Sequence, residues 1–315
     1  MGHGASFDSG RALLKFFRVN RAGLSDRDLV IFGCGYLGCT LAETAAKLGL
    51  HVHAVTRNPE TARRLRRSGI AVFEGFLEDD GWHSAVPSAP ACAVNCVGSF
   101  DRTVEGYHRS YVGGMESIAR WSLNGAPGVL VYTSSTGVYG SASGDVDEET
   151  EPGPLSEKSR ILFEAERMVV DGGLAGRWFI LRLSGLYGPG RHQLLDRVRS
   201  GDSGLSREVD RRMNILHRND ACRAILDCLD AAPEIASQIF NVTSDVAANR
   251  REMIRWLSGH VHPDINENAA PVIVCDRTVP DRVVSNRRIR EVLGWRPRYP
   301  DYQAGYKAIL NGVRS

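Results

Sequence analysis

The sequence predicts an α/β fold, a doubly wound parallel sheet with a small C-terminal lobe, and three observations support it. Short apolar runs rich in β-branched residues alternate with helical stretches from Leu29 onward, as in successive βαβ units. The runs are almost continuously apolar, which is typical of strands covered by helices on both faces. A glycine-rich turn joins the first run directly to the first helix.

Each expected element follows from this alternation. The strands predicted for the main sheet, at least six in number, span residues 29–32, 51–55, 70–73, 92–97, 128–135 and 178–183. The helices predicted between them span residues 39–48, 59–67, 111–121 and 160–170. After Tyr187 the alternation loosens. There we expect helices near 193–199, 219–229 and 250–257 and a short strand at 238–242, which together suggest a smaller lobe.

Composition and charge favour a globular protein with a small-molecule ligand. The 315 residues include 39 Lys and Arg against 37 Asp and Glu, so a formal charge of +2 predicts no nucleic-acid partner. No run reaches the roughly 18 apolar residues of a membrane span. Seven cysteines without a CxxC pair indicate reduced thiols and a cytoplasmic location.

Two further features are read the same way. The histidine pairs 51/53 and 260/262 lack the additional ligands of a metal site, so we expect no metal. Residues 1–27 form a basic, partly amphipathic N-terminal extension. Docking on the protein surface is the favoured interpretation of this segment, and targeting to an organelle remains the alternative.

The glycine-rich turn predicts dinucleotide binding. Gly33-Cys34-Gly35-Tyr36-Leu37-Gly38 is a GxGxxG motif between the first strand and the first helix. Gly33 makes the tight turn, Gly35 lets the backbone approach a pyrophosphate, and Gly38 allows close packing of helix on strand. The N–H groups of the helix N-terminus then face the phosphates.

The end of the second strand favours NADP(H) over NAD(H). NAD sites place an acidic residue about 20 positions after the motif, where it binds the ribose 2′-hydroxyl. This chain has Thr56-Arg57 there, and an arginine pairs with a 2′-phosphate. The alternative is an Arg57 that is merely solvated, and it leaves NAD as the cofactor.

Four further segments extend the pattern beyond the glycine motif. They are YTSSTGVYG at 132–140, RLSGLYGPGR at 182–191, NILHRND at 214–220 and FNV at 240–242. Together with the GxGxxG motif, they resemble the extended short-chain dehydrogenase/reductase family, the NAD(P)-dependent epimerases and dehydratases. The resemblance covers the chain from about Leu29 to the C-terminus and implies a Rossmann-type domain at 28–187. Residues 188–315 would be mainly a substrate-binding lobe, interleaved with that domain.

The resemblance also assigns site residues. Ser135 corresponds to the serine that binds the substrate oxygen being oxidised or reduced. By their positions, the residues implied in cofactor binding are Gly33, Gly35, Tyr36, Leu37, Gly38, Arg57, Leu77, Val97, Gly98, Ser184 and Leu186. Leu77 falls in the family's G-D-L segment near adenine, where Phe76 replaces the aspartate.

The chain departs from the family at the catalytic dyad, a Tyr and a Lys four residues later. Aligning the helix on Glu166 puts Lys158 at the tyrosine position and Leu162 at the lysine position. Such a pattern resembles an atypical subgroup without this dyad. Three explanations stay open: Lys158 is the acid/base, Tyr111 supplies a relocated hydroxyl, or the protein binds cofactor without turnover as a sensor or scaffold. Retention of Ser135 favours an enzyme.

The substrate side carries basic residues. Arg191, His192, Arg212 and His217 lie in segments that form the substrate cleft in the resembled family, and they would suit an anionic or sugar-nucleotide substrate. Surface charges and a packed His217 are the alternative. The resemblance further implies a possible homodimer through helices near 104–123 and 157–171.

Overall fold

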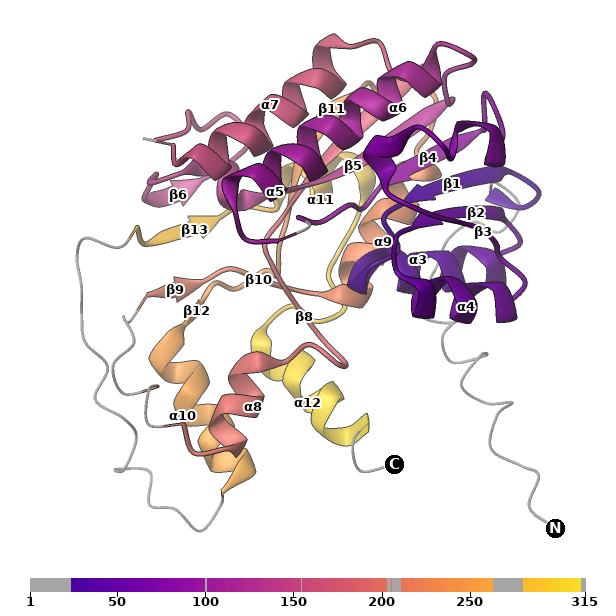
Figure 1. Cartoon of the computed structure of the whole chain (residues 1–315). Helices are drawn as coiled ribbons and strands as arrows, with labels where there is room; N and C mark the ends of the chain where they lie inside the picture. The colour runs from indigo at the N-terminus through magenta and orange to yellow at the C-terminus, as the bar shows by residue number, and fades with distance from the viewer. Residues whose placement is uncertain are drawn as a thin grey trace, which may run out of the picture. The chain divides into compact units, whose positions relative to one another are not determined.

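The structure is a computed structural model of the chain (Figure 1). It describes residues 24–99, 101–153, 155–202, 205, 211–262 and 280–312. Most of the predicted N-terminal extension therefore lies outside the described residues.

A seven-stranded sheet forms the centre of the fold (Figure 1). Its strands, from edge to edge, are β11 (Gln238–Val242), β7 (Arg177–Leu183), β5 (Val129–Ser135), β4 (Cys92–Asn95), β1 (Asp28–Phe32), β2 (His51–Thr56) and β3 (Ala71–Glu74). The pairs from β3 to β5 run parallel. The chain moves outward from β1 to β3 and then returns to β4, so the order reverses between β1 and β4. Open α/β sheets bind ligands at the carboxyl ends of the strands at such a reversal.

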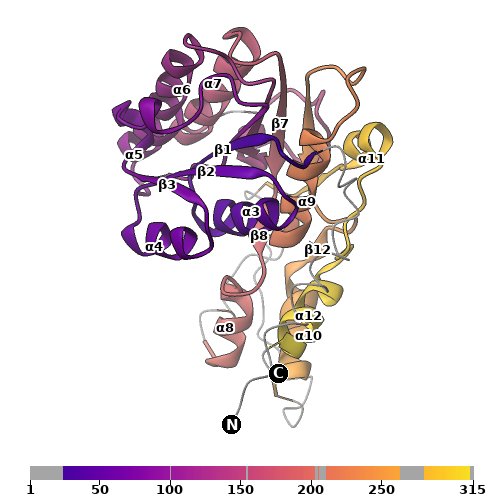
Figure 2. The ribbon, with the colours of Figure 1, turned by 90° about the vertical axis from the view of Figure 1, so that its right-hand side faces the viewer.

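Helices cover both faces of the sheet, which explains why the central strands are apolar throughout (Figures 1 and 2). One face carries α3 (Tyr36–Lys47), α4 (Pro59–Arg67) and α9 (Arg218–Leu229), and the other carries α5 (Val104–His108), α6 (Gly114–Ser122) and α7 (Glu157–Asp171). These elements confirm the predicted doubly wound α/β fold. One difference is β11, which we expected outside the regular series and which forms an edge of the main sheet.

An aromatic cluster anchors the segment that follows β3. The ring centroid of Phe32 lies 4.7 Å from that of Trp82 and 5.5 Å from that of Trp121. Trp82 also donates a hydrogen bond of 2.7 Å from its indole Nε1 to the Leu77 carbonyl. This bond ties the short 3₁₀ helix η1 (Leu77–Asp79) to the core, beside the carboxyl ends of the strands.

The helix expected around 111–121 contains a widened turn. A π-helical turn, η3 (Arg109–Gly113), joins α5 to α6, and such turns are frequent at functional sites. Gly114 follows this turn, and a Cβ built there would lie 3.0 Å from the Leu77 Cδ2 atom. Glycine therefore lets the helix approach η1 closely.

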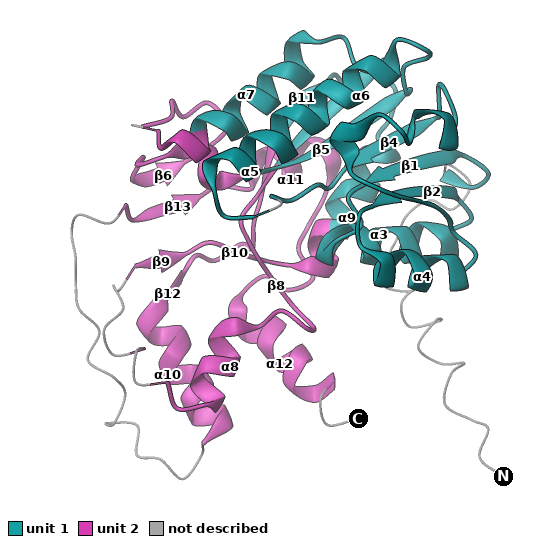
Figure 3. Cartoon of the chain, in the orientation of Figure 1, with its two compact units in different colours: residues 1–134, 160–181, 222–239 teal, residues 135–159, 182–221, 240–315 magenta. Residues whose placement is uncertain are grey.

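Residue contacts divide the chain into two compact units (Figure 3). Unit 1 takes the described parts of residues 1–134, 160–181 and 222–239, and unit 2 takes those of 135–159, 182–221 and 240–315. Both units are thus assembled from several stretches of sequence. The domain boundary expected at residue 187 stays a prediction.

Unit 2 contains three two-stranded pairings. They are β6 (Gly144–Val146) with β13 (Arg282–Val284), β8 (Gly185–Tyr187) with β10 (Ile215–His217), and β9 (Arg212–Met213) with β12 (Ala248–Asn249). Its remaining helices are η4 (Thr136–Tyr139), α8 (Gln193–Arg199), α10 (Arg250–Val261), α11 (Arg287–Leu293) and α12 (Tyr302–Gly312). Leu195, Met253, Leu257, Tyr306 and Ile309 are buried together in its core.

Other expectations concern thiols, metals and membranes. The six cysteines in the described part of the chain are free, and Cys275 lies outside it. Among the described residues, no group of three His, Cys, Asp or Glu side chains is placed to hold a metal. The same residues include no helix long and apolar enough to span a bilayer.

Candidate functional site

The glycine motif makes a tight turn at the carboxyl end of β1. Gly33 has a φ of +82°, and a Cβ there would lie 2.7 Å from Val97 atoms. At Gly38 a Cβ would collide with the Gly33 carbonyl oxygen. Both positions thus require glycine for the turn itself and for helix–strand packing. Gly35 differs, because a Cβ there would meet no described atom within 4 Å.

The first turn of α3 is available to an anion. Its N-cap is Gly35, and no side chain caps this end of the helix. The first backbone N–H groups of a helix have no partner within the helix, and the helix dipole adds positive potential at the same place. The turn therefore has the chemistry of a phosphate site.

A cavity of about 300 Å³ adjoins this turn within unit 1. Its walls come from the segments that follow β1, β2, β3 and β4 and from η3. The lining residues are Gly33, Cys34, Gly35, Val55, Thr56, Arg57, Asn58, Thr61, Gly75, Phe76, Leu77, Glu78, Cys96, Val97, Gly98, Ser99 and Ser110. The cavity thus lies at the strand-order reversal, where this fold class binds ligands.

Two opposite charges face this cavity. Arg57 and Glu78 are the basic and the acidic residue among the described lining residues. Phe76 also lines the cavity, and its ring centroid is 6.0 Å from the Arg57 guanidinium carbon. The Arg109 guanidinium carbon lies 4.8 Å from the same centroid, and Arg109 forms an ion pair with Glu78.

The cysteines in the wall are not nucleophiles. Burial raises the pKa of Cys96 to about 12, and it raises the pKa of Cys34 well above its ordinary value. Both thiols are therefore protonated at neutral pH. They contribute apolar surface to the cavity.

The cavity brings together six of the residues assigned to the cofactor. These are Gly33, Gly35, Arg57, Leu77, Val97 and Gly98. Tyr36, Leu37 and Gly38 form the first turn of α3, next to the lining. Ser184 and Leu186 belong to unit 2, where Ser184 donates a hydrogen bond of 2.9 Å to Thr243.

Sequence reasoning missed several lining residues. Asn58 was detectable, because an Asn before a Pro at a helix start is a capping signature, and its side chain does accept from the Thr61 N–H at 2.9 Å. Ser110 was not detectable from the sequence, because a π turn has no sequence signal and shifts the helix register. Glu78 lies in a 3₁₀ helix of three residues, which is too short to show a period in the sequence.

Tyr111 lies in η3 and is half-buried, packed against the core of unit 1. Its ring centroid is 5.4 Å from that of Tyr107. Burial, and secondarily Tyr107, raise the pKa of Tyr111, while a hydrogen bond with the Ser99 backbone offsets part of this effect. The Tyr111 hydroxyl therefore carries its proton at neutral pH.

Ser135 and Lys158 both belong to unit 2. Ser135 ends β5 and accepts a hydrogen bond of 3.1 Å from the Gly137 N–H, which starts the η4 turn. Lys158 is half-buried at the second position of α7, and Leu162 is buried one turn later.

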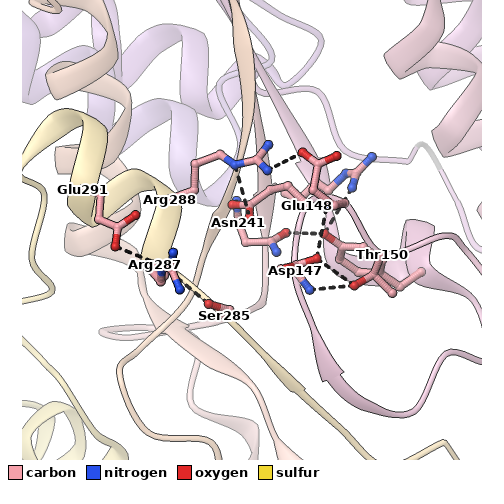
Figure 4. Close-up of polar contacts among 11 residues, drawn as sticks. Asp147, Glu148, Thr150, Asn241, Ser285, Arg287, Arg288 and Glu291 are labelled. Atoms are coloured by element: carbon pink, nitrogen blue, oxygen red, sulfur yellow. Dashed lines mark hydrogen bonds and ion pairs between the residues drawn. The ribbon is translucent and has the colours of Figure 1, made fainter.

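A buried polar network holds the turn that follows Ser135. Tyr139 donates a hydrogen bond of 2.7 Å to Asn241 Oδ1 and accepts one of 3.1 Å from Arg182. Figure 4 shows Glu148 accepting from the Asn241 backbone N–H, at 2.6 Å, and pairing with Arg288. These contacts fix Tyr139 and, through η4, the position of Ser135.

The four residues assigned to the substrate all belong to unit 2 but differ in environment. Arg191 is exposed in the turn after β8. His192 contacts Asp196 at 2.8 Å, and Arg212 forms an ion pair with Asp281 at 3.1 Å. His217 is buried, with its ring centroid 4.0 Å from that of Tyr299.

His217 differs from the other three candidate substrate residues because its pKa is strongly lowered. Burial, and then the charges of Arg218 and Arg298, lower the pKa of His217 to about 3. The ring is therefore neutral at physiological pH. Its Nε2 atom has no hydrogen-bond partner among the described residues.

Comparison with known proteins gives consistent matches. The Escherichia coli K12 protein YeeZ is 26% identical over 285 residues, which cover 87% of this chain and 97% of YeeZ. The Bordetella bronchiseptica enzyme WbmG, in complex with NAD, matches 92% of this chain and 94% of its own with a TM-score of 0.76 at 16% identity. The Thermotoga maritima UDP-glucose 4-epimerase with UDP-glucose matches 91% and 100% with a TM-score of 0.74, also at 16% identity.

At these identities the solved structures establish the fold. Family membership rests on the sequence, because residues 29–243, more than half of the chain, match one family model. The chain therefore belongs to the NAD dependent epimerase/dehydratase family.

Proposed function

We propose that the protein is an NADP(H)-dependent oxidoreductase or epimerase of the extended short-chain dehydrogenase type, acting on an anionic or sugar-nucleotide substrate. One observation supports this most strongly: the cavity beside the glycine turn, with Arg57 in its wall. Family membership and the NAD named for WbmG support a nicotinamide dinucleotide, and Arg57 supports the phosphorylated form.

The residues fit such a cofactor in parts. The uncapped first turn of α3 would bind the pyrophosphate, and the cavity between Gly33 and Phe76 would take the adenosine. Arg57, at the end of β2, would pair with the 2′-phosphate, since a guanidinium binds phosphate through two parallel hydrogen bonds. Thr56 and Arg57, which stand at the end of β2, offer no acidic side chain to bind a free 2′-hydroxyl.

The catalytic assignment is a proposal on three side chains. When bound, the cofactor would give or accept a hydride at the substrate carbon. Ser135 would donate a hydrogen bond to the substrate oxygen. Lys158 or Tyr111 would exchange the proton of that oxygen; the raised pKa of Tyr111 keeps its hydroxyl protonated at neutral pH but also makes it a weaker acid.

On the substrate side, exposed Arg191 and nearby His192 are the best-placed candidates to bind an anionic group. Arg212 would take part if it keeps its ion pair with Asp281 while binding. His217 would act through packing, because it is buried and neutral.

The test of cofactor preference is Arg57→Ala. We expect the dissociation constant for NADPH to rise about ten- to hundredfold, because a charge-assisted contact to phosphate is lost, while that for NADH changes less than about threefold. Fluorescence titration measures both. Arg67→Ala, at an exposed arginine that ends α4 and lies outside the lining, is the control and should leave both constants unchanged.

Equal effects of Arg57→Ala on NADPH and NADH would overturn the assignment of the 2′-phosphate to Arg57. Cofactor binding itself would still stand in that case, since both dinucleotides share the pyrophosphate site.

A second candidate is a redox-sensing NADP(H)-binding regulator without turnover. It is favoured by Lys158 and Leu162, which replace the family's Tyr and Lys. NADPH oxidation with a broad panel of carbonyl compounds distinguishes the two. Turnover of any substrate supports the enzyme, and tight NADPH binding without turnover across the panel supports the regulator.

A further inference from the structure

We propose that Glu78 selects the base of the bound dinucleotide by accepting a hydrogen bond from the exocyclic amino group of adenine, and that Arg109 is the residue that positions Glu78. This inference rests on the proposed dinucleotide function and adds a specificity determinant to it.

The charge pattern of the cavity separates the place of the phosphates from that of the base. Its described lining holds one basic side chain, Arg57 after β2, and one acidic side chain, Glu78 in η1. A carboxylate repels phosphate, so the phosphates belong with the α3 N-terminus and Arg57. Glu78 therefore faces the part of the ligand that carries hydrogen-bond donors and no negative charge.

Glu78 lies in an environment that shields it from water. Its side chain is only 16% exposed, and a carboxylate removed from water requires partners. The Arg109 Nε atom pairs with Glu78 Oε1. An ionised carboxylate has about four acceptor positions on its two oxygens, so Glu78 keeps acceptor capacity for a ligand donor.

Arg109 comes from the widened turn η3 and is not among the described residues that line the cavity. Its guanidinium stacks over Phe76, with 4.8 Å from Cζ to the ring centroid. This stacking holds the arginine against the wall. The ion pair with Glu78 then limits the rotamers of the carboxylate.

The position of Phe76 suits the flat face of a base. Phe76 lines the cavity and precedes Glu78 by two residues, so one short segment supplies a flat apolar surface and an acceptor. Adenine has apolar faces and an amino group at one edge, and this pair of features matches it. Hypoxanthine has the same faces, with a carbonyl oxygen in place of the amino group.

The experiment compares NADPH with its hypoxanthine analogue, reduced nicotinamide hypoxanthine dinucleotide phosphate. Dissociation constants are measured by fluorescence titration for wild type, Glu78→Gln and Glu74→Gln. Glu74, at the end of β3, is the matched control. It makes an ion pair with Arg66 of α4, as Glu78 does with Arg109, but it does not line the cavity.

Wild type should bind NADPH about tenfold or more tightly than the analogue, because two acceptors would face each other in the analogue complex. Glu78→Gln should bring this ratio close to one, since the amide can donate to the carbonyl. Glu74→Gln should retain the wild-type ratio.

Equal binding of the two dinucleotides by wild type would overturn the inference and leave the proposed function standing. An unchanged ratio in Glu78→Gln would do the same. If wild type bound neither dinucleotide, the proposed function would fail together with the inference, and this result is distinct from equal binding.

Discussion

Several buried side chains differ in whether their polar atoms are satisfied, and this difference has consequences for stability. Tyr187 and Tyr139 are both buried in unit 2. The Tyr139 hydroxyl bonds to Asn241 and Arg182, whereas the Tyr187 hydroxyl has no hydrogen-bond partner among the described residues. A buried hydroxyl without a partner costs free energy that a phenyl ring would not.

Replacing each tyrosine by phenylalanine tests this contrast. Tyr187→Phe should leave the free energy of unfolding unchanged or raise it by about 1 kcal/mol, because a buried orphan hydroxyl is removed. Tyr139→Phe should lower it by about 1–3 kcal/mol, because Asn241 and Arg182 lose a partner. Urea unfolding measures both variants. Similar losses in the two would contradict the hydrogen-bond assignments.

His217 predicts a pH dependence of stability. The folded-state pKa of about 3 lies below the ordinary histidine value of 6.5, so the unfolded chain binds the extra proton between these values. Stability is therefore present above pH 6.5 and falls as the pH drops below it, by up to about 1.4 kcal/mol per pH unit.

Asp227 acts in the opposite direction. Burial raises the pKa of this carboxyl from 3.8 to about 6, so the folded state binds more protons in that window and gains stability as the pH falls. The measurement that isolates His217 is the difference between wild type and His217→Phe in urea unfolding at about pH 7.5 and about pH 5.5. Wild type should lose about 1 kcal/mol more than the variant on acidification. Parallel pH profiles would rule out a buried neutral His217.

At the scale of helices and strands, the long elements could be predicted from the sequence and the shortest ones could not. β1 and β2 are apolar runs bounded by turn residues, and α4 starts at an Asn-Pro capping signature, so period and punctuation located them. The strands β9 and β12 have two residues each and form only because distant segments meet. Such strands are too short to show a period.

The residues of the candidate site could be predicted only in part, for the same physical reason. The glycine turn and Arg57 carry local signals, because a fixed spacing from a strand end defines their roles. Glu78, Arg109 and Ser110 come from a 3₁₀ helix and a π turn, which depend on tertiary packing around Leu77 and Gly114. Neither the 3₁₀ helix nor the π turn has a hydrophobic period that a single sequence would show.

Helix capping provides an element-scale prediction in unit 2. Asn249 caps α10, and its side chain accepts hydrogen bonds from the N–H groups of Arg251 at 3.0 Å and Glu252 at 3.4 Å. Asn249→Ala should lower the free energy of unfolding by about 1 kcal/mol, whereas Asn249→Asp should keep the cap. Thermal and urea unfolding provide the measurement, and an equal loss in both variants would contradict the cap.

At the scale of the whole molecule, the family resemblance implies how two chains would associate, through the helices α5, α6 and α7. Leu123, at the end of α6, is 85% exposed, and Val104 and Val170 are also exposed. We propose that these helices form the homodimer contact, and the exposed side chain of Leu123 is the place to test it.

Leu123→Glu should then shift the protein from dimer to monomer in sedimentation velocity, because a buried charge would oppose association. Val246→Glu is the control, as Val246 is exposed in unit 2 and lies outside these helices. A wild-type protein that sediments as a monomer up to high concentration would contradict the proposed dimer.

We propose that this member of the epimerase/dehydratase family has kept a dinucleotide site while losing the usual catalytic dyad. The site is built from the ends of four neighbouring strands, so it depends on the sheet and not on Lys158 or Leu162. Binding can therefore be tested without knowledge of the substrate.

Equilibrium titration of the wild-type protein with NADPH and NADH is the decisive experiment. Saturable binding of both, with NADPH bound about tenfold or more tightly, is the predicted result, because Arg57 adds a contact to the 2′-phosphate. Absence of binding to either dinucleotide would contradict the account.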